Sequence, residues 1–249
     1  MPIALILGAS SGFGAACCRA FAAAGFDIVG VHLDRRAAMP AVEALVAELQ
    51  SGGRHVQFHN INAADDAQRA EVVAQCGTVD VLVHSLAFGS LAPYIGERVL
   101  SRKQLEMTVD VMGHSLVYWC QDLFAAKKLA KGGRVFAMTS SGSHMVWRAY
   151  GPVSAAKCAL EAHVRQLAVE LAPHGVTVNA VLAGVTRTPA LARIPDNDEL
   201  IAQAERRNPH GRLTTPEDVA ACLVELARPG TAWLTGNVLR VDGGEDIAG

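Results

Sequence analysis

The sequence predicts an α/β fold: a doubly wound, seven-stranded parallel sheet of the Rossmann type, in a single domain spanning residues 1–249. Three observations support this prediction. Short apolar runs alternate with stretches of helical period, a glycine-rich turn follows the first apolar run, and no linker, repeat or low-complexity tract divides the chain. With 249 residues, 51% of them hydrophobic, the chain is long enough to bury a large core.

Composition excludes several classes of function. The net charge of −2 gives no reason to expect nucleic acid or an anionic membrane as a partner. No apolar run reaches the ~18 residues of a membrane span, and the N-terminus lacks a basic region before its first apolar run. We therefore expect a soluble, cytoplasmic protein. The six cysteines show no metal-ligand spacing, so we expect reduced, packed thiols and no metal site.

The first strand is predicted at residues 3–7, and a helical stretch covers residues 15–24. Between them lies a turn that contains Gly8, Ser10, Ser11, Gly12, Phe13 and Gly14. A strand, a glycine turn and a helix in this order place backbone N–H groups and a helix N-terminus where a pyrophosphate can bind. The two serines add hydroxyl donors. A tight turn without a ligand is the alternative interpretation.

The second strand is predicted at residues 27–33, followed by a helix at residues 38–50. In dinucleotide-binding folds an acid at the end of this strand prefers the free ribose hydroxyls of NAD, whereas arginine accommodates the 2′-phosphate of NADP. Here His32 occupies the strand-end position, and Asp34, Arg35 and Arg36 follow. The sequence therefore favours NADPH, with NADH possible. A solvated charged loop is the alternative.

Two further strands, at residues 55–61 and 79–84, are predicted to end at the same edge of the sheet. Asn60 and Ile61 are expected to meet the adenine there, and Ser85, Leu86 and Ala87 to pass beside the nicotinamide ribose. His84 lies at the end of the fourth strand. We expect it to satisfy local polar groups rather than to act in catalysis.

A tyrosine and a lysine stand seven positions apart at the start of a predicted helix at residues 152–172. A long helix within residues 101–130 and a strand at residues 134–139 precede them. Pro152 suits the first helical position, pushes Gly151 towards an extended conformation and so leaves Tyr150 ahead of the helix. Further along this helix, Glu161 and Arg165 are expected to pair one turn apart.

This arrangement predicts acid–base chemistry. Inside one helix the two residues would be about 10 Å apart, whereas a tyrosine outside the helix can lean back over Lys157. An ammonium near a phenol favours the phenolate, which makes Tyr150 a better proton donor near neutral pH. The ammonium can also bind ribose hydroxyls. A buried tyrosine and a solvated lysine without a shared role are the alternative.

The remaining elements are a strand at residues 176–182, a loop at residues 183–189, a helix from residue 215 and a last strand at residues 237–241. Thr186 and Thr188 of the loop are expected to contact a dinucleotide, although an ordinary polar connection would read similarly. Residues 189–210 are polar and helical with no strand to pair with, which predicts a lid over the site.

Four motifs together resemble the short-chain dehydrogenase/reductase family along essentially the whole chain. They are GASSGFG, a serine before a Tyr/Lys pair, NAVLAG and VDGG. The commonest family pattern has three residues between tyrosine and lysine, which would place the tyrosine where Val153 stands. Six residues intervene here, His84-Ser-Leu-Ala replaces the usual Asn-Asn-Ala-Gly, and Asp110 replaces the usual asparagine.

These departures resemble the enoyl-acyl-carrier-protein reductases of bacterial fatty acid biosynthesis. Some members carry a further tyrosine ten residues before the catalytic one; Ser140 stands there, as in the type III enzymes. The resemblance implies reduction of trans-2-enoyl thioesters, with Tyr150 stabilising the enolate, Lys157 holding the ribose, and Ser140 binding the substrate carbonyl or shaping the loop. It also implies an acyl carrier protein as partner and a homotetramer built on the long helices.

Two other functions remain open. A carbonyl or 3-oxoacyl reductase on the same scaffold would use the same tyrosine on an alkoxide. A dinucleotide-binding sensor without turnover would account for the displaced tyrosine. Candidates for lining an acyl channel are Phe88, Tyr94, Met145, Trp147 and Ile194, each of which is equally compatible with an ordinary core or interface role.

Overall fold

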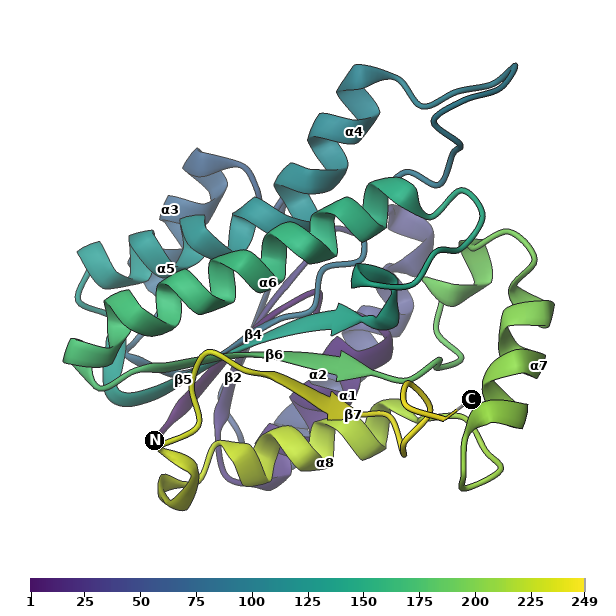
Figure 1. Cartoon of the computed structure of the whole chain (residues 1–249). Helices are drawn as coiled ribbons and strands as arrows, with labels where there is room; N and C mark the ends of the chain where they lie inside the picture. Colours follow the sequence, from purple (N-terminus) through teal and green to yellow (C-terminus); the bar gives the residue numbers. More distant parts are fainter. Residues whose placement is uncertain (249) are drawn as a thin grey trace.

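Seven parallel strands form one sheet in the order β3-β2-β1-β4-β5-β6-β7 (Figure 1). The computed structural model describes residues 1–248. The strands are β1 (Ile3–Leu7), β2 (Asp27–His32), β3 (Val56–Asn60), β4 (Val79–His84), β5 (Leu129–Ser140), β6 (Thr177–Ala183) and β7 (Val238–Val241). The order reverses between β1 and β4, as in a doubly wound fold, so the predicted fold class is confirmed.

Helices cover both faces of the sheet. They are α1 (Gly12–Ala23), α2 (Met39–Ser51), α3 (Asp66–Gln75), α4 (Arg102–Val109), α5 (Ser115–Ala125), α6 (Gly151–Leu171), α7 (Asn197–Arg207) and α8 (Pro216–Leu226). In Figure 1, α3, α5 and α6 lie on one face, whereas α1, α2 and α8 lie on the other. Trp119 and Leu160 are fully buried in the first layer, and Phe21 and Phe136 in the second.

The carboxyl ends of the strands meet at one edge, where α7 and the C-terminal segment also lie (Figure 1). Leu7 of β1 pairs with His84 of β4, and His84 pairs with Ala137 of β5. Ser140 of β5 in turn pairs with Ala183 of β6. The segments that leave β1, β4, β5 and β6 therefore start close together.

Three predicted boundaries were wrong. The helix expected within residues 101–130 consists of α4, a π-helical turn η2 (Asp110–His114) and α5, and it ends at residue 125. Strand β5 begins at Leu129 and runs through both glycines expected to precede it. Gly151 is the first residue of α6 and not extended; with no Cβ, it escapes much of the clash that proline imposes on the residue before it.

Helix α3 was absent from the sequence-based prediction. The Asp65 carboxylate caps it by accepting a hydrogen bond from the Gln68 N–H. Only Arg69, Val72 and Val73 of this helix are buried, so its apolar stripe is short. No helix in residues 1–248 is long and apolar enough to cross a membrane.

Candidate active site

The glycine turn after β1 is closed so tightly that side chains would not fit. Gly8 has φ +87°, and a Cβ built on it would lie 2.2 Å from the Ser85 carbonyl oxygen. A Cβ on Gly14 would lie 1.9 Å from the Gly8 carbonyl oxygen. The bare backbone therefore approaches the start of α1, whose N-cap Ser11 makes no side-chain capping bond. This cradle fits the pyrophosphate of a dinucleotide.

The residues predicted to line the rest of the cradle lie around it. Ser85 donates its N–H to the Leu7 carbonyl, while Leu86 packs against the core and Ala87 is exposed. Thr188 borders Gly12, since a Cβ on that glycine would lie 3.3 Å from the threonine methyl group. The loops that follow β4 and β6 therefore both lie against the glycine turn, although the two strands are far apart in the sequence.

The hydroxyls of the two candidate threonines already have local partners. Thr186 donates to the Gly184 carbonyl (3.0 Å), and Thr188 accepts a hydrogen bond from the Leu191 N–H (3.2 Å). In the glycine turn, Ser10 is half-buried, Ser11 is exposed, and Phe13 packs against the core.

At the ends of β2 and β3, one side-chain amide fixes the following loop. Asn60 accepts from the Asp34 N–H and donates to the Asp34 carbonyl, each at 3.0 Å. The carboxylate of Asp34 lies 3.0 Å from Nδ1 of the buried His32. Ile61 packs against the core, and Arg35 is exposed. The acid in this loop is therefore already engaged by protein groups.

Tyr150 is the N-cap residue of α6, as predicted, and its ring lies against Gly142. A Cβ built on Gly142 would lie 2.4 Å from Cε1 of the ring and 3.2 Å from Oγ of Ser140. That hydroxyl oxygen is buried and has no hydrogen-bond partner among the described residues. Burial raises the pKa of Tyr150, and the nearby Ser140 hydroxyl opposes the shift. The phenol is therefore protonated at neutral pH.

Lys157, in the second turn of α6, is 6% exposed. Its Nζ donates a hydrogen bond to the Met138 carbonyl of β5 at 2.7 Å. Burial lowers the pKa of Lys157 to about 8, and the charge of Glu161 opposes the shift. The prediction of a solvated lysine as the alternative is wrong, because the side chain is buried at the end of β5.

His84 serves as a neutral structural residue. It is 0% exposed, and its Nε2 lies 2.8 Å from Oγ of Ser115. Because that hydroxyl donates its proton to the Val111 carbonyl, Nε2 of His84 must be the donor to Ser115. Burial, together with the charge of Lys157, lowers the pKa of His84 to about 3. This histidine cannot act as an acid at neutral pH.

Several contacts at the site were not predicted. Thr139 donates to the Glu161 carboxylate at 2.6 Å. The expected pair between Glu161 and Arg165 is wrong, because it is not among the ion pairs formed in residues 1–248. The buried Glu245 accepts from the Val185 N–H at 3.0 Å and holds the loop after β6. These partners lie 22 and 60 residues apart, so no local pattern reveals them. The acid following VDGG was the one available signal for Glu245.

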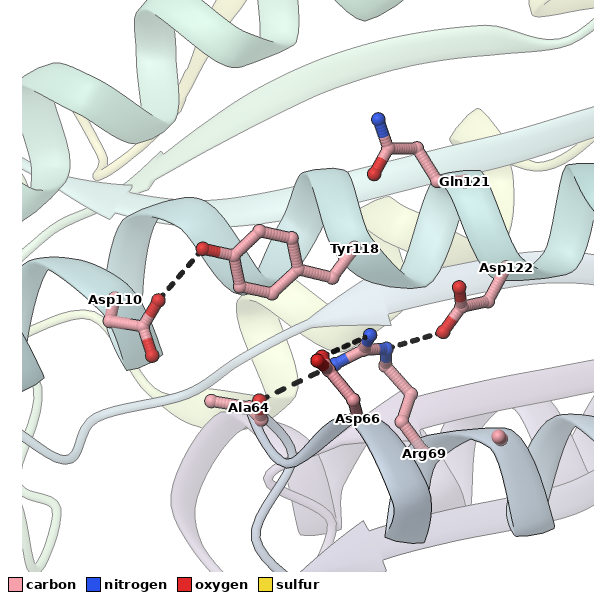
Figure 2. Close-up of a pocket in the computed structure, with 8 residues that line it drawn as sticks. Ala64, Asp66, Arg69, Asp110, Tyr118, Gln121 and Asp122 are labelled. Carbon is pink, nitrogen blue, oxygen red and sulfur yellow. Dashed lines mark hydrogen bonds and ion pairs between the residues drawn. The ribbon is translucent and has the colours of Figure 1, made fainter.

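A separate surface hollow of about 650 Å³ lies between α3 and α5 (Figure 2). Its Arg69 is bound by Asp66 and Asp122, and its Tyr118 hydroxyl donates to Asp110 at 2.8 Å. Each charged group there already has a protein partner. No group of three or more potential metal ligands occurs in residues 1–248.

Comparisons with known proteins show which family the chain matches. Residues 8–245 match the family described as Enoyl-(Acyl carrier protein) reductase. The short-chain reductase protein NovJ of Streptomyces niveus is 29% identical, over 97% of this chain and 93% of NovJ. Galactitol 2-dehydrogenase (L-tagatose-forming) of Cereibacter sphaeroides is 32% identical, over 98% of this chain and 94% of that enzyme.

A solved structure shows the same fold. The enoyl-[acyl-carrier-protein] reductase (NADH) of Aquifex aeolicus VF5 superimposes with a TM-score of 0.87 at 25% identity, over 100% of this chain and 97% of that one. The chain belongs to the short-chain dehydrogenase/reductase family of oxidoreductases, in the branch that resembles the enoyl-acyl-carrier-protein reductases.

Proposed function

We propose that this protein is an NADPH-dependent reductase of the C2=C3 double bond of trans-2-enoyl thioesters. The observation that carries the proposal is the position of Tyr150, outside α6 and beside the unpartnered hydroxyl of Ser140, with Lys157 buried at the end of the same strand. The spacing of six residues between tyrosine and lysine supports the enoyl branch over the commoner carbonyl reductases.

When bound, a nicotinamide dinucleotide supplies the hydride that reduces C3 of the substrate. Negative charge then develops on the thioester oxygen, and a protonated phenol placed at that oxygen stabilises the enolate by a hydrogen bond or by proton transfer. Tyr150 suits this role because burial keeps it protonated. The Ser140 hydroxyl is free to donate a second hydrogen bond to the same oxygen.

Lys157 is proposed to hold the dinucleotide ribose. One of its three N–H protons is used by the Met138 carbonyl, which leaves two for hydroxyl acceptors. With its pKa near 8 the side chain is mostly charged at pH 7. Its positive charge also favours the developing phenolate of Tyr150.

The loop after β2 supports NADPH over NADH. The carboxylate of Asp34 is engaged by His32, whereas Arg35 and Arg36 are exposed and form no ion pair with any residue in 1–248. Free guanidinium groups bind phosphate with paired hydrogen bonds. Replacing Arg35 by serine should weaken NADPH binding about tenfold and leave NADH binding within twofold.

Residues 189–210 are proposed as a lid over an acyl channel. This segment contains η5 (Leu191–Arg193) and α7, and its Leu191, Ile201 and Ala204 form a small apolar cluster with Leu213, which follows the segment. Phe88, Tyr94 and Met145 are half-exposed, as expected of apolar side chains that would contact the acyl chain of a bound substrate. We propose acyl carrier protein as the carrier of the thioester and a homotetramer as the assembly.

Reduction of a carbonyl is the second candidate function, since the dehydrogenase relative from Cereibacter sphaeroides is named for a polyol. Assays of NADPH oxidation with crotonyl and acetoacetyl thioesters, side by side, separate the two reactions. Turnover of the crotonyl thioester alone supports our proposal. Turnover of the acetoacetyl thioester alone replaces it with the carbonyl reductase, and tight NADPH binding without turnover on either indicates a sensor.

The role of Tyr150 has its own test. Replacing it by phenylalanine should lower kcat by about 10²–10³-fold, while the Kd for NADPH changes less than threefold. Tyr118→Phe is the matched control, because that phenol lies at the hollow between α3 and α5. Unchanged kcat in Tyr150→Phe would remove the phenol from the mechanism.

A further inference from the structure

The ammonium group of Lys157 is buried, so its positive charge needs a stabilising partner within the protein. Of the charged group's contacts, the Met138 carbonyl is the one hydrogen bond made within residues 1–248. A carbonyl dipole offsets only part of the cost of burying an ammonium group. Without a nearby anion the side chain would lose its proton near neutral pH.

The titratable groups on the surrounding elements do not provide that anion, with one exception. His84 on β4 is neutral, and Tyr150 before α6 is a protonated phenol. On η2, Asp110 accepts from Tyr118, and His114 pairs with His163 of α6 at 2.9 Å. Glu161, one turn after Lys157 on α6, is the carboxylate whose charge opposes the loss of the proton.

Strand β5 contacts both side chains, Lys157 and Glu161. The carbonyl of Met138 accepts from Lys157, and the side chain of the next residue, Thr139, donates to Oε1 of Glu161 at 2.6 Å. Thr139 is 4% exposed, so its hydroxyl is shielded from water. A hydrogen bond donated to a carboxylate fixes the direction of its oxygen atoms.

We propose that Glu161, held in place by Thr139, is a positioning residue that keeps Lys157 charged for dinucleotide binding. The proposal rests on the proposed function insofar as Lys157 serves the dinucleotide. Glu161 itself is assigned no contact with the substrate or with the dinucleotide. Its effect passes entirely through the lysine ammonium group.

The direct test is the titration of Lys157 by NMR in protein carrying ¹³C-labelled lysine, with Lys157→Arg to assign its signal among the five lysines. In Glu161→Gln the titration midpoint of Lys157 should fall by about one pH unit. NADPH should then bind about fivefold more weakly at pH 8 and nearly unchanged at pH 6.5, where the lysine stays charged.

Three variants sharpen this test. Thr139→Val should lower the titration midpoint of Lys157 less than Glu161→Gln does. In Glu161→Asp the midpoint should stay close to that of the parent, because the negative charge remains. Glu170→Gln is the control, since this exposed glutamate lies near the other end of α6 and pairs with Gln166. A midpoint in Glu161→Gln within about 0.2 of the parent value would overturn the proposal.

The titration is independent of the reaction that the protein catalyses. A lowered midpoint with weakened NADPH binding, in a protein that does not reduce crotonyl thioesters, would refute the proposed substrate and retain the role of Glu161. Should Glu161→Gln fold poorly, Thr139→Val decides the question, because a Lys157 midpoint equal to that of the parent would show that the Thr139 hydroxyl does not hold the carboxylate in place.

Discussion

The indole of Trp147 donates a hydrogen bond from Nε1 to the carbonyl oxygen of Pro195 at 3.0 Å. This contact joins the loop before α6, which carries Tyr150, to the segment before α7. Arg148 and Asp196 add an exposed ion pair at 3.8 Å between the same two segments. An exposed pair of this length contributes little, so the indole hydrogen bond contributes more than the ion pair to the attachment between the proposed lid and the loop that carries Tyr150.

Replacing Trp147 by phenylalanine should loosen the lid while keeping an aromatic ring in place. The loss of one neutral hydrogen bond, worth about 1 kcal/mol, should raise the KM for the thioester about three- to tenfold and leave the Kd for NADPH unchanged. Steady-state kinetics and NADPH fluorescence measure the two quantities. Trp233→Phe, at an exposed position, is the control. An unaltered KM would show that the lid closes without this contact.

The glycine turn makes a prediction that does not depend on the substrate. In Gly14→Ala the new Cβ would meet the Gly8 carbonyl at 1.9 Å, so the turn must shift. We expect NADPH affinity to fall at least about tenfold and stability to fall by about 1–3 kcal/mol. In Gly230→Ala the new Cβ would meet no atom within 4 Å, and both values should stay near those of the parent. Fluorescence titration and urea unfolding provide the measurements, and equal losses in both variants would contradict the close-approach argument.

His84 should make the protein less stable as the pH falls. Its pKa is about 3 in the folded protein and 6.5 ordinarily, so the unfolded chain binds one more proton between these values. Stability from this group is complete above pH 6.5 and is lost as the pH falls towards 3, at up to about 1.4 kcal/mol per pH unit. Urea unfolding at pH 4.5–7 should show a shallower pH dependence in His84→Gln, although that variant is less stable at pH 7. The exposed His55→Gln should keep the parent slope.

Elements with strong local signals were predicted well. The alternation of apolar runs and helical stretches gave all seven strands, and Pro152 located the start of α6 to within one residue. Helix α3 was missed because its buried stripe is short. The π-helical turn was missed because one added residue per turn changes little in the apolar pattern. Gly113 lies there against the Ala156 carbonyl of α6, where a Cβ would come within 3.1 Å.

The candidate site was predictable where one segment carries the information. Tyr150 and Lys157 follow from their spacing, and the glycine turn follows from its place after β1. The supporting contacts were not predictable, because they join distant segments. Glu161 has an arginine one turn away in sequence, and only the position of β5 shows that its carboxylate turns to Thr139 instead.

Arg69 provides a last prediction, concerning the attachment of α3 to α5. Its side chain is 6% exposed, its Nε donates to Asp122 at 2.5 Å, and its guanidinium lies 5.2 Å from the centre of the Tyr118 ring (Figure 2). Asp66, the second carboxylate, has a side chain that is 92% exposed.

Removing the charge of Asp122 leaves a buried cation poorly compensated, which should cost about 2–3 kcal/mol in Asp122→Asn. Asp66→Asn should cost less than about 1 kcal/mol, because water screens that pair. Urea unfolding of both variants, and of Arg69→Met/Asp122→Leu, measures these costs. The double variant should be at least as stable as Asp122→Asn, because it leaves no unpaired buried charge; equal costs for the two single variants would show that burial does not distinguish the two carboxylates.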